Sequence, residues 1–216
     1  MLNLKELSSS DEGKIFIVGI ILLIAYIFGI IVTYFISVED ANHLLGMGIT
    51  NFFFGRAAGI SYGYTVEFSD TLILLINILI EFIMVMIIYP LFVLSWNKSF
   101  HVASLKNFFA NVEKQKTKYK TFFDRYGKYG LFIFVWFPFW MTGPVIGSII
   151  GFLIGIKHYT TMLIVLSGTS LAILAWTYFL KEIMDLLYEL NSNATYIILG
   201  LFIMITILFK IFKTQK

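Results

Sequence analysis

The apolar stretch from Tyr129 to Lys157 contains two prolines, Pro138 and Pro144. Each proline removes a backbone hydrogen-bond donor and clashes with the preceding turn, so one uninterrupted helix over this stretch is disfavoured. Glycine then recurs at every fourth position along one helix face, at Gly143, Gly147, Gly151 and Gly155. A face without side chains allows another backbone to approach closely. The stretch therefore predicts two half-length helices joined by a break.

The composition indicates an integral membrane protein. Hydrophobic residues make up 59% of the chain and charged residues 13%, whereas about a quarter of the residues of a soluble domain are charged. Four apolar runs approach the ~20 residues that cross a bilayer. These predicted spans are residues 15–36, 72–95, 159–180 and 195–212. The chain has no cysteine, which excludes disulfides and thiolate metal sites.

Charges on the connecting segments predict the topology, because short cytoplasmic loops carry an excess of lysine and arginine. Residues 96–128 hold eight basic and two acidic residues, whereas residues 181–193 hold one lysine and three acids. A single crossing by residues 129–157 would put the acidic loop inside and the basic C-terminal tail outside. A re-entrant hairpin that returns to the cytoplasmic side agrees with every loop. The same reasoning predicts a second re-entrant segment, residues 44–64, on the outer side.

The predicted fold is therefore an all-α integral membrane protein with one domain over residues 1–216. It has four spanning helices, two oppositely oriented re-entrant helical hairpins and both termini in the cytoplasm. An amphipathic connector over residues 104–126 is expected to lie against anionic lipid. Inverted repeats with broken helices are typical of secondary transporters. No repeat is apparent at the level of residues, so the symmetry is inferred from the topology alone.

Three polar residues lie within the predicted membrane segments. Glu81 is near the middle of the span 72–95, and Asn77 lies one turn earlier on the same face. An ionised carboxylate at that depth costs at least ~2.5 kcal/mol, so it requires a partner or a proton. Glu81 is expected either to bind a proton or a cation, or to lock two helices together. Arg56 is expected to pair with Glu81, to bind an anionic headgroup or to extend to the outer interface.

The break in residues 129–157 offers backbone groups rather than charges. Thr142 or Gly143 can cap the second arm, with Pro144 at its first helical position. Free N–H groups at a helix start favour an anion, although these residues can also serve only to turn the chain. The predicted substrate-facing residues are Pro138, Trp140, Thr142, Gly143 and Pro144. Gly147 and Gly151 are expected to serve packing, and Trp140 is either a stacking surface or filler.

The segment FFDRYGKYGLFIFVWFPFWMTGPVIGSIIGFLIG, preceded by FFFGRAAGISYGY, resembles the small multidrug export family, a distant relative of the DedA/VTT membrane proteins. The resemblance covers about Phe54–Ala175 and includes Arg125 and Gly127 ahead of the proline. It implies two opposed re-entrant helices and a role in moving lipids or lipid phosphates between leaflets. DedA-type relatives place arginines in the second re-entrant motif, whereas residues 131–156 carry no charge here. An arginine-bound phosphate is therefore disfavoured at that motif.

The sequence thus predicts a transporter or flippase-like carrier in the plasma membrane of a prokaryote. Its expected partners are membrane lipids and an amphiphilic substrate, a lipid phosphate ahead of a small hydrophobic cation, and no nucleic acid. Proton coupling and a homodimer are left open. No cofactor and no metal site are predicted. The alternatives are a non-transporting membrane organiser and an intramembrane serine hydrolase, because residues 59–63 match the G-x-S-x-G pattern around Ser61.

Overall fold

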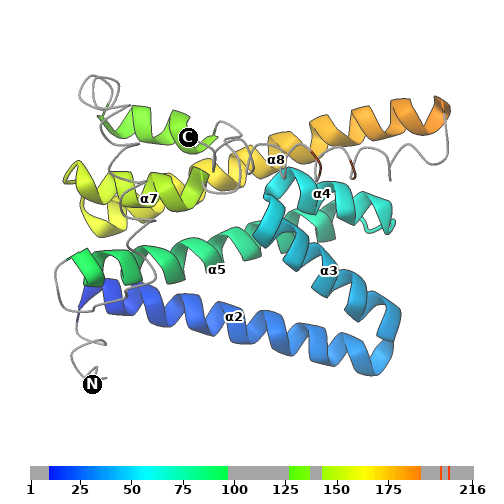
Figure 1. Ribbon diagram of the computed structural model, residues 1–216, viewed down its shortest axis with the longest axis horizontal. Helices are drawn as coiled ribbons and strands as arrows, with labels where there is room; N and C mark the ends of the chain where they lie inside the picture. Colours follow the sequence, from blue (N-terminus) through cyan, green and yellow to red (C-terminus); the bar gives the residue numbers. More distant parts are fainter. Residues whose placement is uncertain (1–9, 97–126, 137–142, 191–199, 201–203, 205–216) are drawn as a thin grey trace. The chain divides into compact units, whose positions relative to one another are not determined.

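The computed structural model describes residues 10–96, 127–136 and 143–190, and the single residues 200 and 204. These parts are almost entirely helical, and they contain no strand. Residues 127–136 form one helix, and the others are α2 (Asp11–Ile36), α3 (Val38–Phe54), α4 (Arg56–Thr65), α5 (Asp70–Trp96), α7 (Gly143–Leu153) and α8 (His158–Leu190) (Figure 1). The predicted all-α class is confirmed.

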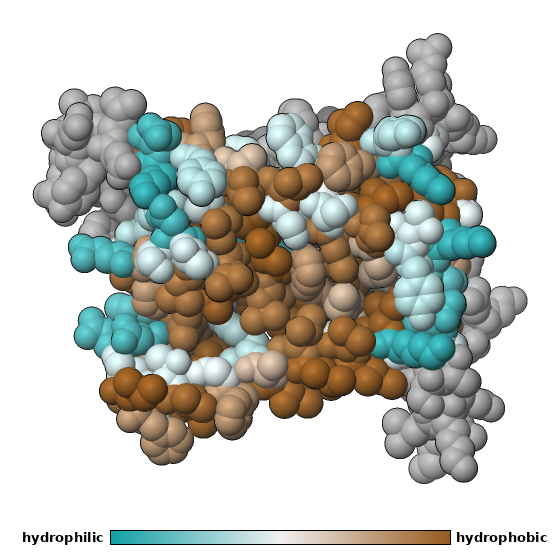
Figure 2. Space-filling model, turned by 180° about the vertical axis from the view of Figure 1, so that it is seen from behind, coloured by the Kyte–Doolittle hydropathy of each residue, from teal (hydrophilic) through white to brown (hydrophobic). Residues whose placement is uncertain are grey.

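Three of the four predicted spans correspond to helices that are long and apolar enough to cross a membrane. The helical segments are Asp11–Ile36, Asp70–Leu94 and His158–Ile183. Many large apolar side chains on α2 are exposed, and hydrophobic residues cover much of the face drawn in Figure 2. Such a surface suits hydrocarbon rather than water. The predicted span 195–212 and the predicted connector 104–126 lie outside the described residues, apart from residues 200 and 204.

The chain divides into two compact units. Unit 1 comprises Met1–Ala25 and Phe82–Ser170, and unit 2 comprises Tyr26–Glu81 and Leu171–Lys216. Each unit contains one helical hairpin and the start of the long helix that follows it, α8 in unit 1 and α5 in unit 2. Each unit also contains a later part of the other long helix.

The first hairpin, in unit 2, consists of α3 and α4 and breaks at Gly55 (Figure 1). Gly55 has φ 86°, a conformation that favours glycine. A Cβ on Gly59 would lie 2.7 Å from Cβ of Asn51, and one on Gly63 would lie 3.0 Å from Sδ of Met47. Residue numbers rise along α4 as they fall along α3, so the two helices pack antiparallel. The predicted segment 44–64 is thus the inner part of a longer hairpin.

The second hairpin, in unit 1, consists of residues 127–136 and α7. A Cβ on Gly147 would meet Val135, and one on Gly151 would lie 3.0 Å from Cδ2 of Leu131. These contacts again show that the two helices are antiparallel. A hairpin of two half-length helices, as predicted from the sequence, requires this arrangement. At 1.5 Å per residue, each arm is ~15 Å long, about half of a ~30 Å hydrocarbon core. The break itself lies in residues 137–142, outside the described residues.

The second arms and the helices after them repeat at an offset of 88 residues. α4 ends at Thr65 and α7 at Leu153, while α5 begins at Asp70 and α8 at His158. The hydrogen bonds of the two turns also match. The N–H groups of residues 66, 67, 68 and 73 donate to the carbonyls of 62, 64, 63 and 69, and those of 154, 155, 156 and 161 donate to 150, 152, 151 and 157.

The two copies also share the position of a residue with positive φ and the positions of their glycines. Glu67 has φ 58° and the equivalent Gly155 has φ 81°. The glycines of the two second arms correspond pairwise: Gly55 with Gly143, Gly59 with Gly147, and Gly63 with Gly151. The expectation that no repeat exists at the level of residues is therefore wrong. The repeat lies in the small residues that close helix packing requires, and the larger side chains mostly differ.

Gly155 corrects one detail of the predicted packing face. It was expected to continue the series of Gly147 and Gly151 along that face. A Cβ on Gly155 would meet nothing within 4 Å, and the residue instead adopts the positive φ of the turn that follows α7. Glycine at this position thus suits the backbone conformation of the turn and does not serve close helix packing.

Candidate functional site

Arg56 and Glu81 form a buried ion pair in unit 2. Arg56 is the first residue of α4, immediately after the break at Gly55, and Glu81 lies in α5. Arg56 Nε lies 3.6 Å from Glu81 Oε1, and the two side chains are 5% and 6% exposed. Of the roles predicted for Arg56, pairing with Glu81 is confirmed. The buried arginine does not extend outward along the surface.

The pair leaves most donors of Arg56 unused. Neither Nη1 nor Nη2 has a hydrogen-bond partner within the parts of the chain that the structure describes. A guanidinium carries five N–H donors, and an unsatisfied buried donor costs about 1–3 kcal/mol. The start of α4 adds further donors, because Gly55 provides no side-chain cap for the first N–H groups of the helix. This arrangement can bind an anionic group or a carbonyl oxygen.

Two buried asparagines lie in the same unit, Asn51 in α3 of the hairpin and Asn77 in α5 after it. The Asn51 amide Nδ2 donates to Oδ1 of Asn77 over 2.6 Å, and Nδ2 of Asn77 donates to the Ile73 carbonyl over 2.7 Å. Gly59 makes room for the pair, since a Cβ there would lie 2.5 Å from Oδ1 of Asn77. Asn77 lies one helical turn before Glu81, as predicted. We call Asn51, Arg56, Asn77 and Glu81 the polar cluster of the first hairpin.

The equivalent positions of the second hairpin are almost free of polar groups. At the offset of 88 residues, Arg56 corresponds to Pro144, Asn77 to Val165 and Glu81 to Thr169. Asn51 contacts Gly59 as Val135 contacts Gly147, so Val135 takes its place. All four replacements are buried, and Thr169 Oγ1 has no hydrogen-bond partner among the described residues.

The other predicted site residues divide between described and undescribed parts. Gly143 and Pro144 are buried as the first two residues of α7, so the proline lies one position later in the helix than predicted. Gly147 and Gly151 pack the hairpin, as predicted. Gly127 has φ 48° at the start of helix 127–136. Four predicted residues lie outside the described residues: Arg125, Pro138, Trp140 and Thr142.

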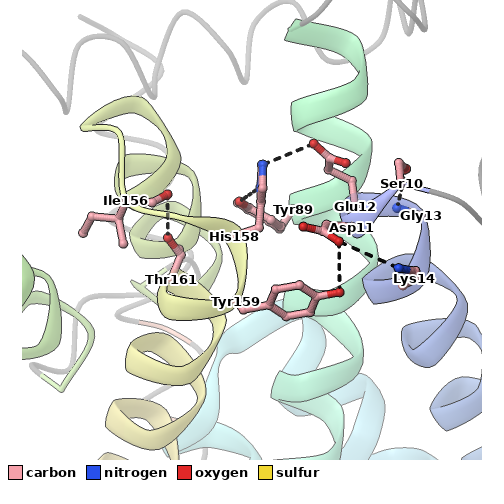
Figure 3. Close-up of polar contacts among 10 residues, drawn as sticks. All are labelled: Ser10, Asp11, Glu12, Gly13, Lys14, Tyr89, Ile156, His158, Tyr159 and Thr161. Carbon is pink, nitrogen blue, oxygen red and sulfur yellow. Dashed lines mark hydrogen bonds and ion pairs between the residues drawn. The ribbon is translucent and has the colours of Figure 1, made fainter.

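A second polar group lies in unit 1, where the sequence had indicated no site (Figure 3). The Tyr89 hydroxyl is 2.6 Å from Nδ1 of His158, and His158 Nε2 is 3.3 Å from Oε1 of Glu12. The Tyr159 hydroxyl donates to Oδ1 of Asp11 over 3.2 Å. Glu12 and His158 are 146 positions apart in the sequence. No local pattern could have joined them.

Ser61, the candidate nucleophile, is buried inside α4. The G-x-S-x-G turn of hydrolases places its serine between a strand and a helix, so the structural context differs. No group of three or more His, Asp, Glu or Cys residues that could hold a metal ion occurs within the described ranges. Within the described residues, Ser61 Oγ has no hydrogen-bond partner that could act as a base.

Comparison with known proteins gives one family. The model of a family described as "Putative small multi-drug export protein" matches residues 55–175, more than half of the 216 residues. No curated protein and no solved structure matches the chain. The predicted kinship with the DedA/VTT proteins therefore stays a prediction. The matched region begins at the Gly55 break and includes both second arms, all of α5 and the first half of α8.

Proposed function

Because this chain belongs to the family of small multi-drug export proteins, we propose that it is a membrane carrier for an amphiphilic substrate. The polar cluster of the first hairpin binds the polar part of that substrate. The apolar part contacts the hydrophobic surface of the surrounding helices. Three helices long and apolar enough to span a bilayer support this role.

One observation supports an anionic headgroup as the polar part of the substrate. Arg56 is buried and paired through Nε, while Nη1 and Nη2 have no partner in the described parts of the chain. Arginine binds phosphate and carboxylate groups through two such parallel donors. A lipid phosphate, which combines an anionic headgroup with acyl chains, fits both the guanidinium and the apolar surroundings.

The flux of a fluorescent lipid phosphate between leaflets of reconstituted liposomes tests this assignment. We expect wild-type protein to exceed empty liposomes, and Arg56→Gln to lose about tenfold of that flux, the equivalent of one charged hydrogen bond. Lys14→Gln is the matched control, because Lys14 is an exposed cation in unit 1. Equal flux with wild-type protein and without protein would refute the carrier role.

A hydrophobic cation bound by Glu81 is the second candidate substrate. The family description names drug export, and Glu81 is a buried carboxylate in an apolar helix. Glu81→Gln should then abolish cation efflux from liposomes, whereas Arg56→Gln should not reduce it. If Arg56→Gln alone lowers flux and no cation is moved, the lipid phosphate is the substrate.

We further propose that both hairpins are re-entrant and enter the membrane from opposite sides. The half-length arms of the second hairpin and the loop charges support this topology. The chain has no cysteine, so single cysteines can be introduced without a prior deletion. Cysteines at the exposed positions Lys128 and Lys157 should react with an impermeant reagent from the same side, and those at Glu39 and Glu67 from the other. Labelling of Lys128 and Lys157 from opposite sides would contradict the topology.

A further inference from the structure

His158 is held by side chains from two other helices (Figure 3). It begins α8, and its two ring nitrogens contact Tyr89 of α5 and Glu12 of α2. We infer that His158 is a proton-binding site, with Glu12 as counter-ion and Tyr89 as the partner whose hydrogen bond changes with the bound proton. That the proton drives transport rests on the proposed carrier function. The proton site itself rests on the geometry alone.

The neutral state has a defined arrangement of hydrogens. An ionised carboxylate can only accept a hydrogen, so the 3.3 Å contact with Glu12 assigns the single hydrogen of the neutral ring to Nε2 of His158. Nδ1 is then the acceptor, and the Tyr89 hydroxyl donates to it over 2.6 Å. The three side chains therefore form one directed chain, from Tyr89 through His158 to Glu12.

Binding a proton reverses one link of this chain. Both nitrogens of an imidazolium are donors, so Nδ1 must donate to the Tyr89 oxygen, and the tyrosine hydrogen must turn away. The 3.3 Å contact between His158 Nε2 and Glu12 Oε1 then joins two opposite charges. Histidine is the side chain best suited to such a change near neutral pH.

The surroundings connect the ring both to water and to the second hairpin. The side chains of His158 and Glu12 are partly exposed, at 26% and 15%. Tyr89 is fully buried in the apolar core of unit 1, which also contains Leu131 and Val135 of the second hairpin. Phe152, in the last turn of α7, stacks on the imidazole with ring centroids 5.9 Å apart. A proton from water can thus reach a group that contacts the hairpin core.

The other charged and titratable groups near His158 come from α2 and from the start of α8. Asp11 of α2 adds a second carboxylate, which accepts from Tyr159 and lies 3.9 Å from Lys14. In unit 2, the position equivalent to His158 is Asp70, whose carboxylate lies 2.6 Å from Nζ of Lys181. Aspartate and lysine both keep their charges near neutral pH. The ion pair at the start of α5 in unit 2 therefore keeps both of its charges. The contact of His158 with Glu12 at the start of α8 in unit 1 becomes an ion pair only when His158 binds a proton.

The first experiment detects the proton without transport. Replacement of His43 and His101 by glutamine leaves His158 as the only histidine, and solid-state NMR of its 15N-labelled ring in lipid bilayers reports both nitrogens. We expect the Nε2–H tautomer in alkaline buffer and protons on both nitrogens after acidification. Glu12→Gln should allow both neutral tautomers, whereas Tyr89→Phe should retain Nε2–H. A ring that stays neutral in folded protein on acidification, or an Nδ1–H tautomer, would overturn the inference.

The second experiment distinguishes proton binding by His158 from a purely structural role in joining α8 to α2 and α5. In His158→Gln, the amide nitrogen can still donate to Glu12 and the amide oxygen can still accept from Tyr89, but no proton can bind. We expect the ratio of substrate flux with and without a pH gradient to fall to unity in this variant, while flux without a gradient persists. His43→Gln should keep the wild-type ratio. An unchanged ratio in His158→Gln would show that His158 serves only as a structural tie.

The two experiments also separate this inference from the proposed function. If wild-type protein moves no substrate, the carrier role fails, and the NMR result alone decides whether His158 binds a proton. If wild-type protein moves substrate and the ring stays neutral, the carrier role stands and the proton site is wrong. Should His158→Gln fail to fold, Glu12→Gln takes its place, because it removes the counter-ion and is expected to lower the same ratio.

Discussion

The first and second hairpins share a backbone design and differ in what they bury. Both have antiparallel arms that pack at glycines four residues apart, and both end in turns with the same hydrogen bonds. The first buries Arg56 and Glu81 where the second buries Pro144 and Thr169. The comparison shows that close packing requires glycines, whereas the remaining core positions can carry either charge or hydrocarbon.

This difference has a physical cost. A buried ion pair loses its hydration, and a single contact of 3.6 Å recovers that loss only in part. The second hairpin shows that the same backbone packs without any such pair. This contrast between the hairpins supports the proposal that the charges of the first hairpin serve binding rather than stability.

The largest expected effect comes from breaking the ion pair on one side. Arg56→Met leaves Glu81 buried and unpaired, which should lower the free energy of unfolding by about 3–5 kcal/mol. Unfolding in mixed micelles with increasing dodecyl sulfate, followed by circular dichroism, measures this loss. The double variant Arg56→Met/Glu81→Leu, which resembles the second hairpin, should recover most of it. If the double variant is as unstable as the single one, the two hairpins differ in more than their side chains.

Substitution of the glycines at which the two arms of each hairpin pack should destabilise both hairpins. Gly59→Ala and Gly147→Ala each place a methyl group against buried neighbours, Asn51 and Val135 respectively. Overpacking of this kind costs about 1–3 kcal/mol. We expect the larger loss at Gly59, because Cα of Asn51 would lie only 3.2 Å from the new carbon.

Gly29→Ala is the control for this pair. A Cβ on Gly29 would meet nothing within 4 Å, so the variant should be neutral or gain up to about 1 kcal/mol from helix propensity. The same unfolding measurement applies. A loss confined to one hairpin would contradict the shared packing design.

Replacing the two asparagines by valine, the residue at the equivalent positions of the second hairpin, should have a smaller effect on stability. Asn51→Val and Asn77→Val each remove one partner of the 2.6 Å hydrogen bond, and each should cost about 1 kcal/mol. The double variant should lose less than the sum of the two, because neither amide is then left without its partner. A double-mutant cycle in the same unfolding assay measures this coupling, and strictly additive losses would show that the amides do not interact.

The smallest expected effect concerns the ion pair between Asp70 and Lys181 at the start of α5. Asp70→Asn removes the charge that faces Lys181, and because both side chains are more than a third exposed, the loss should be about 0.2–1 kcal/mol. Raising the ionic strength of the assay should reduce the difference from wild type. A loss that is independent of salt would indicate a packing role for Asp70.

Sequence reasoning identified much of the fold and part of the site. Long apolar runs and loop charges were sufficient to predict three described spans, and the two prolines predicted the two half-length arms on either side of residues 137–142. Glu81 and Arg56 were identified because each is a rare charge in an apolar segment, and their pairing was one of three roles that the sequence left open for Arg56. Asn51 was missed, although it is also a polar residue in a predicted membrane segment. The two glycine series were visible in the sequence too, but their equivalence became clear only from the matching turns.

Hydrophobicity, loop charge and the positions of proline and glycine are local properties, and the sequence by itself determined the helical membrane class and the broken segments from them. Contacts between distant residues are different, because any polar side chain in an apolar helix has several candidate partners. Only the tertiary structure decided that Arg56 pairs through Nε, that Asn51 donates to Asn77, and that His158 lies between Glu12 and Tyr89. Helix rotation and register place these groups, and both depend on packing over the whole unit.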